Sequence, residues 1–366
     1  MTERKRPLAL ALEIDGDGAH PAAWRRAAHP PTELLGSRRL RDVATVAERA
    51  GFTLVTIDDE ITPPGEAPDV VGRVGAIERA AFAAAATSVL GIAPTISTTY
   101  TEPFHVSSQL AALDHIAAGR GAWVVTASRG ADVAATWGRP HITDPAALRR
   151  EAADAVEVVR RLWDSWEDDA VIRDVATSRY VDRDRLHYID FTGETFAVKG
   201  PAIVPRPPQG QLVVLAATDL VPPELIDVAL VRGGTLADLR ARLEEASTPR
   251  RFAEIEVALD VPGLPATERL ARLDAHRPWP ASGRLRYAGD APGLVALLGA
   301  LADVADGVRL IPAVLDDDLA ELSRLVIPAL VARRLAIRPH AGASLRATLG
   351  LPRPENRYAT SAGAPR

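Results

Sequence analysis

The 366-residue chain contains no cysteine, which excludes disulfide bonds, thiolate metal sites and cysteine nucleophiles together. It also lacks any apolar run near the ~20 residues that a membrane-spanning helix needs. Charges of both signs are interspersed and the formal net charge is -5, so the sequence shows neither a basic tract for nucleic acid nor an acidic tail. These features favour a soluble protein of the reducing cytoplasm, without a nucleic-acid or membrane partner.

The N-terminus superficially resembles a signal peptide, because basic residues at 4–6 precede an apolar stretch. That stretch, Leu8–Leu12, is too short for the apolar core of a signal peptide, and Glu13 and Asp15 interrupt it. We therefore predict that it is the first buried strand.

Short apolar segments alternate with amphipathic helical patterns, which predicts a parallel sheet in an α/β protein. Eight strands can be assigned, and they predict a (β/α)8 TIM barrel formed by one domain over residues 1–366. The expected strands are Leu8–Leu12, Leu54–Ile57, Val89–Ile96, Ala122–Thr126, Leu212–Ala216, Val228–Val231, Ile255–Leu259 and Val308–Ile311. The expected helices are Leu40–Ala50, Val70–Ala86, one after His105, Pro145–Trp163, Leu236–Leu243, Ala291–Leu301 and Leu319–Leu335.

Two stretches lack a clear periodicity, and the connection after the fifth strand is short. We interpret residues 166–208 and 262–286 as insertions, the first of them packed over the C-terminal mouth of the barrel. After the fifth strand only residues 218–226 remain, and Pro222 and Pro223 leave room for one helical turn at most. The fifth barrel helix should therefore be nearly absent.

Polar residues collect where the second, third and fourth strands end, and these ends form the ligand-binding face of a barrel. Asp59 follows the second strand, the third leads into residues 95–100, and Thr126 and Ser128 follow the fourth. Such hydroxyls and carboxylates suit the polar edge of a ligand ring. The alternative is that Asp59 caps a helix and the hydroxyls bond to turn backbone.

Two other groups of residues are candidates for chemistry. His105 begins the helix after the third strand, where it would serve as a general base or bond to a backbone carbonyl. Glu167, Asp168 and Asp169 form a carboxylate cluster with no histidine at metal-ligand spacing, so we predict a solvated face and no metal site.

Several motifs along the chain resemble those of one family. They are the runs Thr98–Arg120 (TTYTEPFHVSSQLAALDHIAAGR) and Leu162–Tyr180 (LWDSWEDDAVIRDVATSRY), Ala23-Trp24-Arg25 near the N-terminus, and Thr348–Pro354 near the C-terminus. Together they resemble the bacterial luciferase-like flavin monooxygenases, in the branch of the nitrilotriacetate and dibenzothiophene-sulfone monooxygenases.

The resemblance implies a function as well as a fold. It implies reduced FMN from a separate flavin reductase, a homodimer, and insertion of one oxygen atom into a small organic substrate. Asp59, Thr95, Ser97 and Thr98 match positions that line the flavin ring in the family. His105 or Tyr100 would be the proton donor or acceptor.

The positions on the phosphate side of the cofactor depart from the family pattern. Val124 replaces an Asn of the fourth strand, Arg149 a Tyr of the fourth helix, and Ala217-Thr218-Asp219 a Gly-Ser phosphate loop after the fifth strand. Arg149 and Thr218 are the remaining candidates for that end of the cofactor. The departures leave two alternatives: a flavin-free barrel that serves as a subunit partner or ligand-binding protein, and a deazaflavin-dependent or cofactor-independent enzyme.

Overall fold

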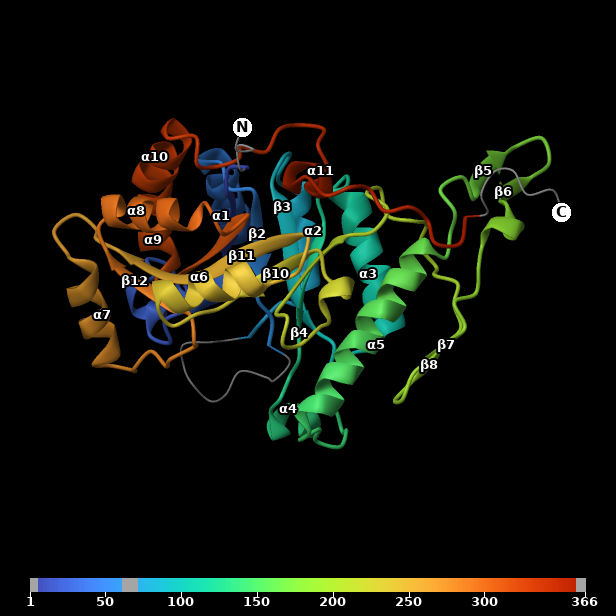
Figure 1. The fold of residues 1–366 in the computed structure, drawn as a ribbon, viewed down its shortest axis with the longest axis horizontal. Helices are drawn as coiled ribbons and strands as arrows, with labels where there is room; N and C mark the ends of the chain where they lie inside the picture. The colour runs from blue at the N-terminus through green and yellow to red at the C-terminus, as the bar shows by residue number, and fades with distance from the viewer. Residues whose placement is uncertain (1–5, 61–71, 360–366) are drawn as a thin grey trace.

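The protein is described by a computed structural model over residues 6–60 and 72–359. Eight parallel strands close into a barrel, because the sheet runs β10-β9-β4-β3-β2-β1-β13-β11 and β10 pairs back with β11. Helices surround the barrel (Figure 1). The strands are β1 (Ala9–Glu13), β2 (Leu54–Ile57), β3 (Gly91–Ser97), β4 (Ala122–Thr126), β9 (Val213–Ala216), β10 (Val228–Val231), β11 (Arg250–Leu259) and β13 (Gly307–Pro312). The predicted (β/α)8 barrel is thus confirmed.

The helices follow the strands in the expected alternation. The predicted helix from Val70 begins at Ala76, with its first two positions outside the described residues. The main helices are α1 (Ser37–Ala50), α2 (Ala76–Ala85), α3 (Pro103–Ile116), α5 (Pro145–Asp164), α6 (Leu236–Glu245), α8 (Ala291–Leu301), α9 (Leu315–Glu321) and α10 (Ile327–Ala332), with a π-helical turn at Leu322–Val326. In the described parts of the chain, no helix combines the length and apolarity needed to cross a bilayer.

The fifth barrel helix is reduced to a single 3₁₀ turn, η4 (Pro223–Leu225), as predicted. Pro222 precedes this turn and Pro223 begins it, and neither has a backbone N–H to donate. The chain then enters β10 directly at Val228. The segment after β9 therefore offers no α-helix N-terminus to the mouth of the barrel.

The interior of the barrel is apolar in the half nearer the N-terminal ends of the strands. Small and aliphatic side chains from alternate strand positions pack there, including Ala9, Ala93 and Leu215. Leu345 and Leu349 of α11 (Leu345–Leu349) pack against the same cluster, so α11 closes the N-terminal end of the barrel (Figure 1).

The half of the interior nearer the C-terminal ends of the strands holds buried charges. Arg309 of β13 donates to Glu13 of β1 and Glu254 of β11, each at 2.5 Å, and its Nε donates to Thr56 of β2 at 3.0 Å. Burial raises the pKa of Glu13 against the opposing charge of Arg309. Burial alone would also raise the pKa of Glu254, but three arginines, Arg309 first among them, lower it to about 2. These ion pairs join the neighbouring strands β1, β13 and β11 directly beneath the mouth.

The first insertion, expected over the mouth, packs mostly on the side of the barrel. Its apolar residues Ile189, Val198 and Ala202 pack against Val158 and Leu162 of α5. Its hairpins are β5–β6 (Val171–Asp174, Arg179–Val181) and β7–β8 (Phe191–Thr192, Ala197–Val198), and β5–β6 extends away from the barrel at the right of Figure 1. The long helix α5 carries apolar residues on the side away from the barrel, and covering them explains this position. The insertion reaches the rim of the mouth through the β7–β8 tip, where residues 195 and 196 line a pocket.

The second irregular stretch contains regular structure that the sequence pattern did not indicate. It forms α7 (Ala266–Asp274) and leads into β12 (Leu285–Gly289), which pairs in parallel with the upper part of β11. A further short helix, α4 (Ala131–Thr136), follows β4. β12 pairs with β11 beyond the point where β10 ends, so the sheet extends further toward the mouth on this side of the barrel.

The buried charges beneath the mouth give a stability prediction. Arg309→Met leaves Glu13 and Glu254 buried without their shared counter-ion, and should lower the free energy of unfolding by about 3–5 kcal/mol. Chemical denaturation measures this, with Arg324→Met as control, because Arg324 forms an ion pair at the surface and should cost at most about 0.5 kcal/mol. Adding Glu13→Gln to Arg309→Met should recover part of the loss, because Glu13 has no other arginine partner among the described residues, whereas Glu254 keeps Arg232 and Arg284. Equal effects of the two single variants would contradict this account.

Candidate functional site

The polar side chains of the mouth come from alternate positions at the strand ends. Ala93 on β3 and Val124 on β4 belong to the interior cluster. Since strand side chains alternate between faces, Thr95 and Ser97 on β3 and Thr126 on β4 also point inward. Hydroxyl groups therefore lie on the inside of the barrel at the end where ligands bind.

These hydroxyls open into a pocket of about 370 Å³, which we call the strand-tip pocket. Its volume lies within the range of small-molecule binding sites. The lining residues come from the ends of β2, β3 and β4 and the helices that follow them: Asp59, Glu60, Ala76, Ile77, Glu78, Thr95, Ile96, Ser97, Thr101, Gln109, Thr126, Ser128 and Val133.

Thr95 contributes an unpartnered hydroxyl to this pocket. The residue is 3% exposed, and its Oγ1 has no hydrogen-bond partner within the described structure. Buried polar atoms in native proteins almost always have a partner. A buried hydroxyl that lines a pocket without one indicates that a bound molecule supplies the hydrogen bond.

Ser97 and Thr98 bond to the turns at the strand ends, as the alternative interpretation expected. Ser97 Oγ accepts the Thr99 N–H at 3.2 Å and bonds the Ser128 hydroxyl at 2.9 Å, while it still lines the pocket. Thr98 Oγ1 donates to the Thr126 carbonyl at 3.1 Å and does not line the strand-tip pocket. Thr98 therefore fixes the strand ends.

Asp59 combines both roles considered for it. Its Oδ2 accepts the Ala76 N–H at 2.7 Å at the start of α2, and its side chain also lines the strand-tip pocket. The carboxylate is thus a helix cap that faces the ligand space.

The two candidates for proton transfer differ in their bonding. The Tyr100 hydroxyl donates to the Pro140 carbonyl at 3.1 Å and accepts the Ile142 N–H at 3.2 Å, so it holds the loop between α4 and α5. His105 is exposed on the first turn of α3. It precedes Gln109 of the strand-tip pocket by four residues and therefore lies on the same face of that helix.

Arg149 and Thr218 do not join the strand-tip pocket. Arg149 lies on α5 about three turns before Arg160, on the same face, because 11 residues at about 3.6 per turn complete nearly three turns. Arg160 Nε donates to the Leu225 carbonyl at 3.0 Å, so this face of α5 turns toward the segment after β9. Arg149 is exposed at the mouth end of that face.

Thr218 lines a second pocket of about 390 Å³ at the ends of β9 and β10, which we call the β9 pocket. Asp219 and Glu245 place two carboxylates beside it. Its two arginines are already bonded, since Arg232 donates to Glu254 at 2.5 Å and Arg242 to Asp238 at 2.7 Å. The β9 pocket is therefore a poor site for an anion.

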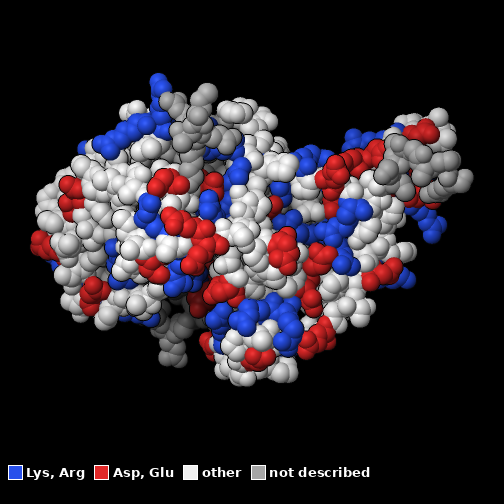
Figure 2. Space-filling view, in the orientation of Figure 1, with Lys and Arg blue, Asp and Glu red and all other residues white. Residues whose placement is uncertain are grey.

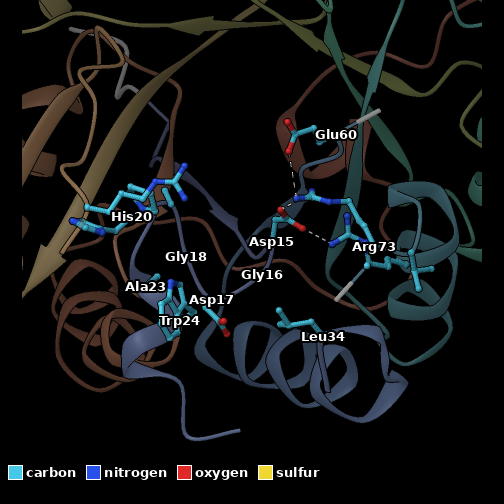
Figure 3. A pocket seen from close by; sticks show the side chains of 16 residues that line it. Asp15, Gly16, Asp17, Gly18, His20, Ala23, Trp24, Leu34, Glu60 and Arg73 are labelled. Carbon is cyan, nitrogen blue, oxygen red and sulfur yellow. Dashed lines mark hydrogen bonds and ion pairs between the residues drawn. The ribbon is translucent and has the colours of Figure 1, made fainter. Parts of the chain in front are cut away.

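A third pocket, of about 390 Å³, lies over the loop after β1 (Figure 3). Figure 3 shows Trp24 on one wall and Arg73 on the other, where Arg73 contacts Asp15 at 2.9 Å. The rings of Trp24 and His276 pack in a T-shaped arrangement with their centroids 5.7 Å apart, so Trp24 also packs on the segment 262–286. Glu60 lines this pocket and the strand-tip pocket, which are therefore neighbours.

The carboxylates at 167–169 are ion-paired, and the predicted solvated face is found for Asp168 and Asp169, which are exposed, but not for Glu167. Glu167 is buried and accepts from His187 at 2.8 Å. Hydrogen bonds from Arg353 first, and also from Arg206, lower the pKa of Asp168 to about 2. The cluster thus ties the insertion to the C-terminal segment. Across the described residues, we find no group of three potential ligands arranged for a metal ion.

The sequence reasoning missed Gln109 and the buried charges under the mouth. Gln109 lies in the middle of α3, where one polar residue on a helix gives no signal of its own. Glu13, Glu254 and Arg309 did carry a signal, because each is a charge inside an apolar strand pattern. Charges at such positions indicate a paired interior.

Comparison with known proteins assigns the family. Residues 20–255 match the family described as luciferase-like monooxygenase. The chain is 31% identical over 329 residues to a subunit of the pristinamycin IIA synthase of Streptomyces pristinaespiralis, covering 90% of this chain and 94% of that protein. The chain belongs to the luciferase-like monooxygenase family.

Other relatives match over a smaller part of the chain or share the fold at lower sequence identity. N-acetyl-S-(2-succino)cysteine monooxygenase of Bacillus subtilis (strain 168) is 36% identical over 219 residues, which cover 59% of this chain and 49% of that protein. The chain spans about half the length of several curated relatives it matches. EDTA monooxygenase from Chelativorans sp. BNC1 shares the fold, with a TM-score of 0.80 at 21% identity over 95% of this chain and 99% of that one.

The residues present fit one end of a flavin and not the other. The strand-tip pocket offers the ring a buried free hydroxyl at Thr95 and an amide at Gln109, and such groups match the donors and acceptors along the ring edge. The β9 pocket offers a phosphate two carboxylates and no unengaged arginine among its lining residues. The ring side is therefore suited to the cofactor and the phosphate side is not.

The bonding of the two threonines predicts opposite stability effects. Thr95→Val removes a buried hydroxyl without a partner, and should leave the free energy of unfolding unchanged or raise it by about 1 kcal/mol. Thr98→Val removes a hydroxyl that donates to a carbonyl, and should lower it by about 1 kcal/mol. Chemical denaturation of both ligand-free variants tests the pair. A clear decrease in the free energy of unfolding of Thr95→Val would show that the Thr95 hydroxyl has a protein partner.

Proposed function

We propose that this chain is the oxygenase of a two-component, FMN-dependent monooxygenase. It takes reduced FMN from a separate flavin reductase and uses oxygen to oxygenate a small organic substrate. Family membership supports this proposal, and the observation that supports it most directly is the unpartnered Thr95 hydroxyl in the strand-tip pocket. The absence of cysteine suits a cytoplasmic enzyme, and by resemblance we propose a homodimer of single-domain barrels over residues 1–366.

The protein residues then act as follows. Thr95 and Gln109 hydrogen-bond the flavin ring, and the Ser97–Ser128 pair keeps the β3 and β4 ends in position. Bound reduced flavin supplies the capacity to react with oxygen. The neighbouring pocket beside Trp24 is a suitable space for the substrate, because it is partly apolar and shares Glu60 with the strand-tip pocket.

A proton must be held near the reacting centre, and His105 is the better candidate for it. The Tyr100 hydroxyl is already engaged by the 140–142 loop, whereas the described structure shows no side-chain hydrogen bond for His105. Its exposed position one turn before Gln109 places it on the face of α3 that borders the strand-tip pocket, outside the residues that line it.

Binding of reduced FMN tests the proposal directly. Anaerobic titration of the protein with reduced FMN should show saturable binding, and rapid mixing with oxygen should then give reoxidation at a rate at least about tenfold different from that of free reduced FMN, because the site excludes water. Thr95→Val should weaken binding about fivefold. No saturable binding, together with reoxidation at the free rate, would contradict the proposed function.

The proton-transfer role predicts a separation of binding from chemistry. His105→Gln should slow single-turnover oxidation of the bound flavin roughly 10²-fold and leave FMN affinity within about twofold. Tyr100→Phe is the matched control: it should cost about 1 kcal/mol of unfolding free energy with little change in the rate. A normal rate for His105→Gln would exclude this histidine.

A second candidate is that the chain is one of two different subunits of an oxygenase. The observation in its favour is that the chain spans 94% of a protein named as a synthase subunit and about half of other relatives. In that case the flavin would bind mainly to a longer partner. Absence of flavin binding by the isolated chain would favour this candidate.

A further inference from the structure

The starts of α2, α3 and α5 at the mouth are occupied by the protein's own carboxylates, whereas within the described structure the six-residue helix α4 has no side-chain cap. A helix N-terminus with free N–H groups is the common site for a phosphate at the mouth of an α/β protein. Here Asp59 accepts from the first turn of α2 at 2.7 Å and Glu102 from that of α3 at 2.8 Å. Asp144 accepts two N–H groups of α5, at 2.9 and 3.1 Å. These three N-termini are closed to a second anion.

Two helices further round the barrel repeat the arrangement. Asp260 accepts an N–H at the start of α7, and Asp290 accepts one in the first turn of α8. Each of these carboxylates satisfies an N–H group and the positive end of a helix dipole that would otherwise attract a phosphate. The first turn of α6 is capped by the neutral hydroxyl of Thr235.

The segment after β9 does not provide another binding site for a phosphate. The resemblance places the phosphate of the family cofactor at this segment. In the structure it contains a single 3₁₀ turn that begins at Pro223 and is preceded by Pro222, and the adjoining β9 pocket presents Asp219 and Glu245. A phosphate there would meet two negative charges at short range and no helix N-terminus.

The geometry points to a mouth that binds a flavin by its ring and ribityl chain and does not select its phosphate. This inference rests on the proposed function. The attraction that remains comes from basic side chains over α4 and the beginning of α5 (Figure 2), and the exposed Arg149 belongs to this segment. Attraction between exposed charges is weak and screened by salt, whereas a built phosphate site persists in salt.

A comparison of FMN with riboflavin tests the inference. Affinities of the purified chain for both flavins, oxidised and reduced, are measured at low salt and at about 0.5 M salt. At high salt the two affinities should agree within about threefold, and Arg149→Ala should remove any preference that remains at low salt. FMN binding more than about tenfold tighter at high salt would overturn the inference and leave the proposed function standing. Failure of both flavins to bind would overturn both this inference and the proposed function.

The two acids of the β9 pocket provide a second test. Asp219→Asn combined with Glu245→Gln should raise the affinity for FMN about threefold and leave that for riboflavin unchanged, because the repulsion acts on the phosphate alone. Glu244→Gln is the matched control: this exposed neighbour does not line the pocket and should change neither affinity. An unchanged ratio of FMN to riboflavin affinity in the double variant would overturn the assigned role of these acids.

Discussion

The ion pairs of Arg309 are the constraint on which the mouth of this barrel depends. Arg309 joins β13 to β1, β2 and β11, and with its partners it fills the interior directly beneath the ligand face. Since buried charges are costly unless paired, these strand ends have little freedom to move apart. The charged side of the mouth is thereby filled, and the strand-tip pocket opens at the ends of β2, β3 and β4, where the inward side chains are short hydroxyl residues.

The strands could be predicted well because each is buried on both faces by the barrel and its helices. β2, β4 and β10 begin and end at the predicted residues, since a continuous apolar run bounded by polar residues has few alternatives. β12 was missed because it pairs with only part of β11 and its five residues are all half-buried, so it has no apolar run. α7 was missed because its buried face includes Arg269, whose charge is paired with Asp317 and Asp318.

The site was partly readable from the sequence. Alternation along β3 places Thr95 and Ser97 on one face, and a barrel turns that face toward a ligand. The sequence could not show that the Thr98 hydroxyl would bond to a carbonyl of β4 while that of Thr95 would stay free, because this depends on the register between the strands. The position of the insertion could not be predicted from the sequence either, because its apolar residues could have packed on the mouth or on α5.

The acidic residues at the helix starts have a consequence beyond helix stability. In a sequence, an Asp or Glu before a helical pattern is a signal for a helix N-terminus, because the side chain accepts the first free N–H groups. The same bond removes the group that most often holds a phosphate in this type of fold. Stabilising α2, α3, α5, α7 and α8 with carboxylates of the same chain therefore narrows the range of ligands that the mouth can select. In this barrel, selectivity for a ligand must come from the hydroxyl and amide groups of the strand-tip pocket and from the shape of the adjoining pocket.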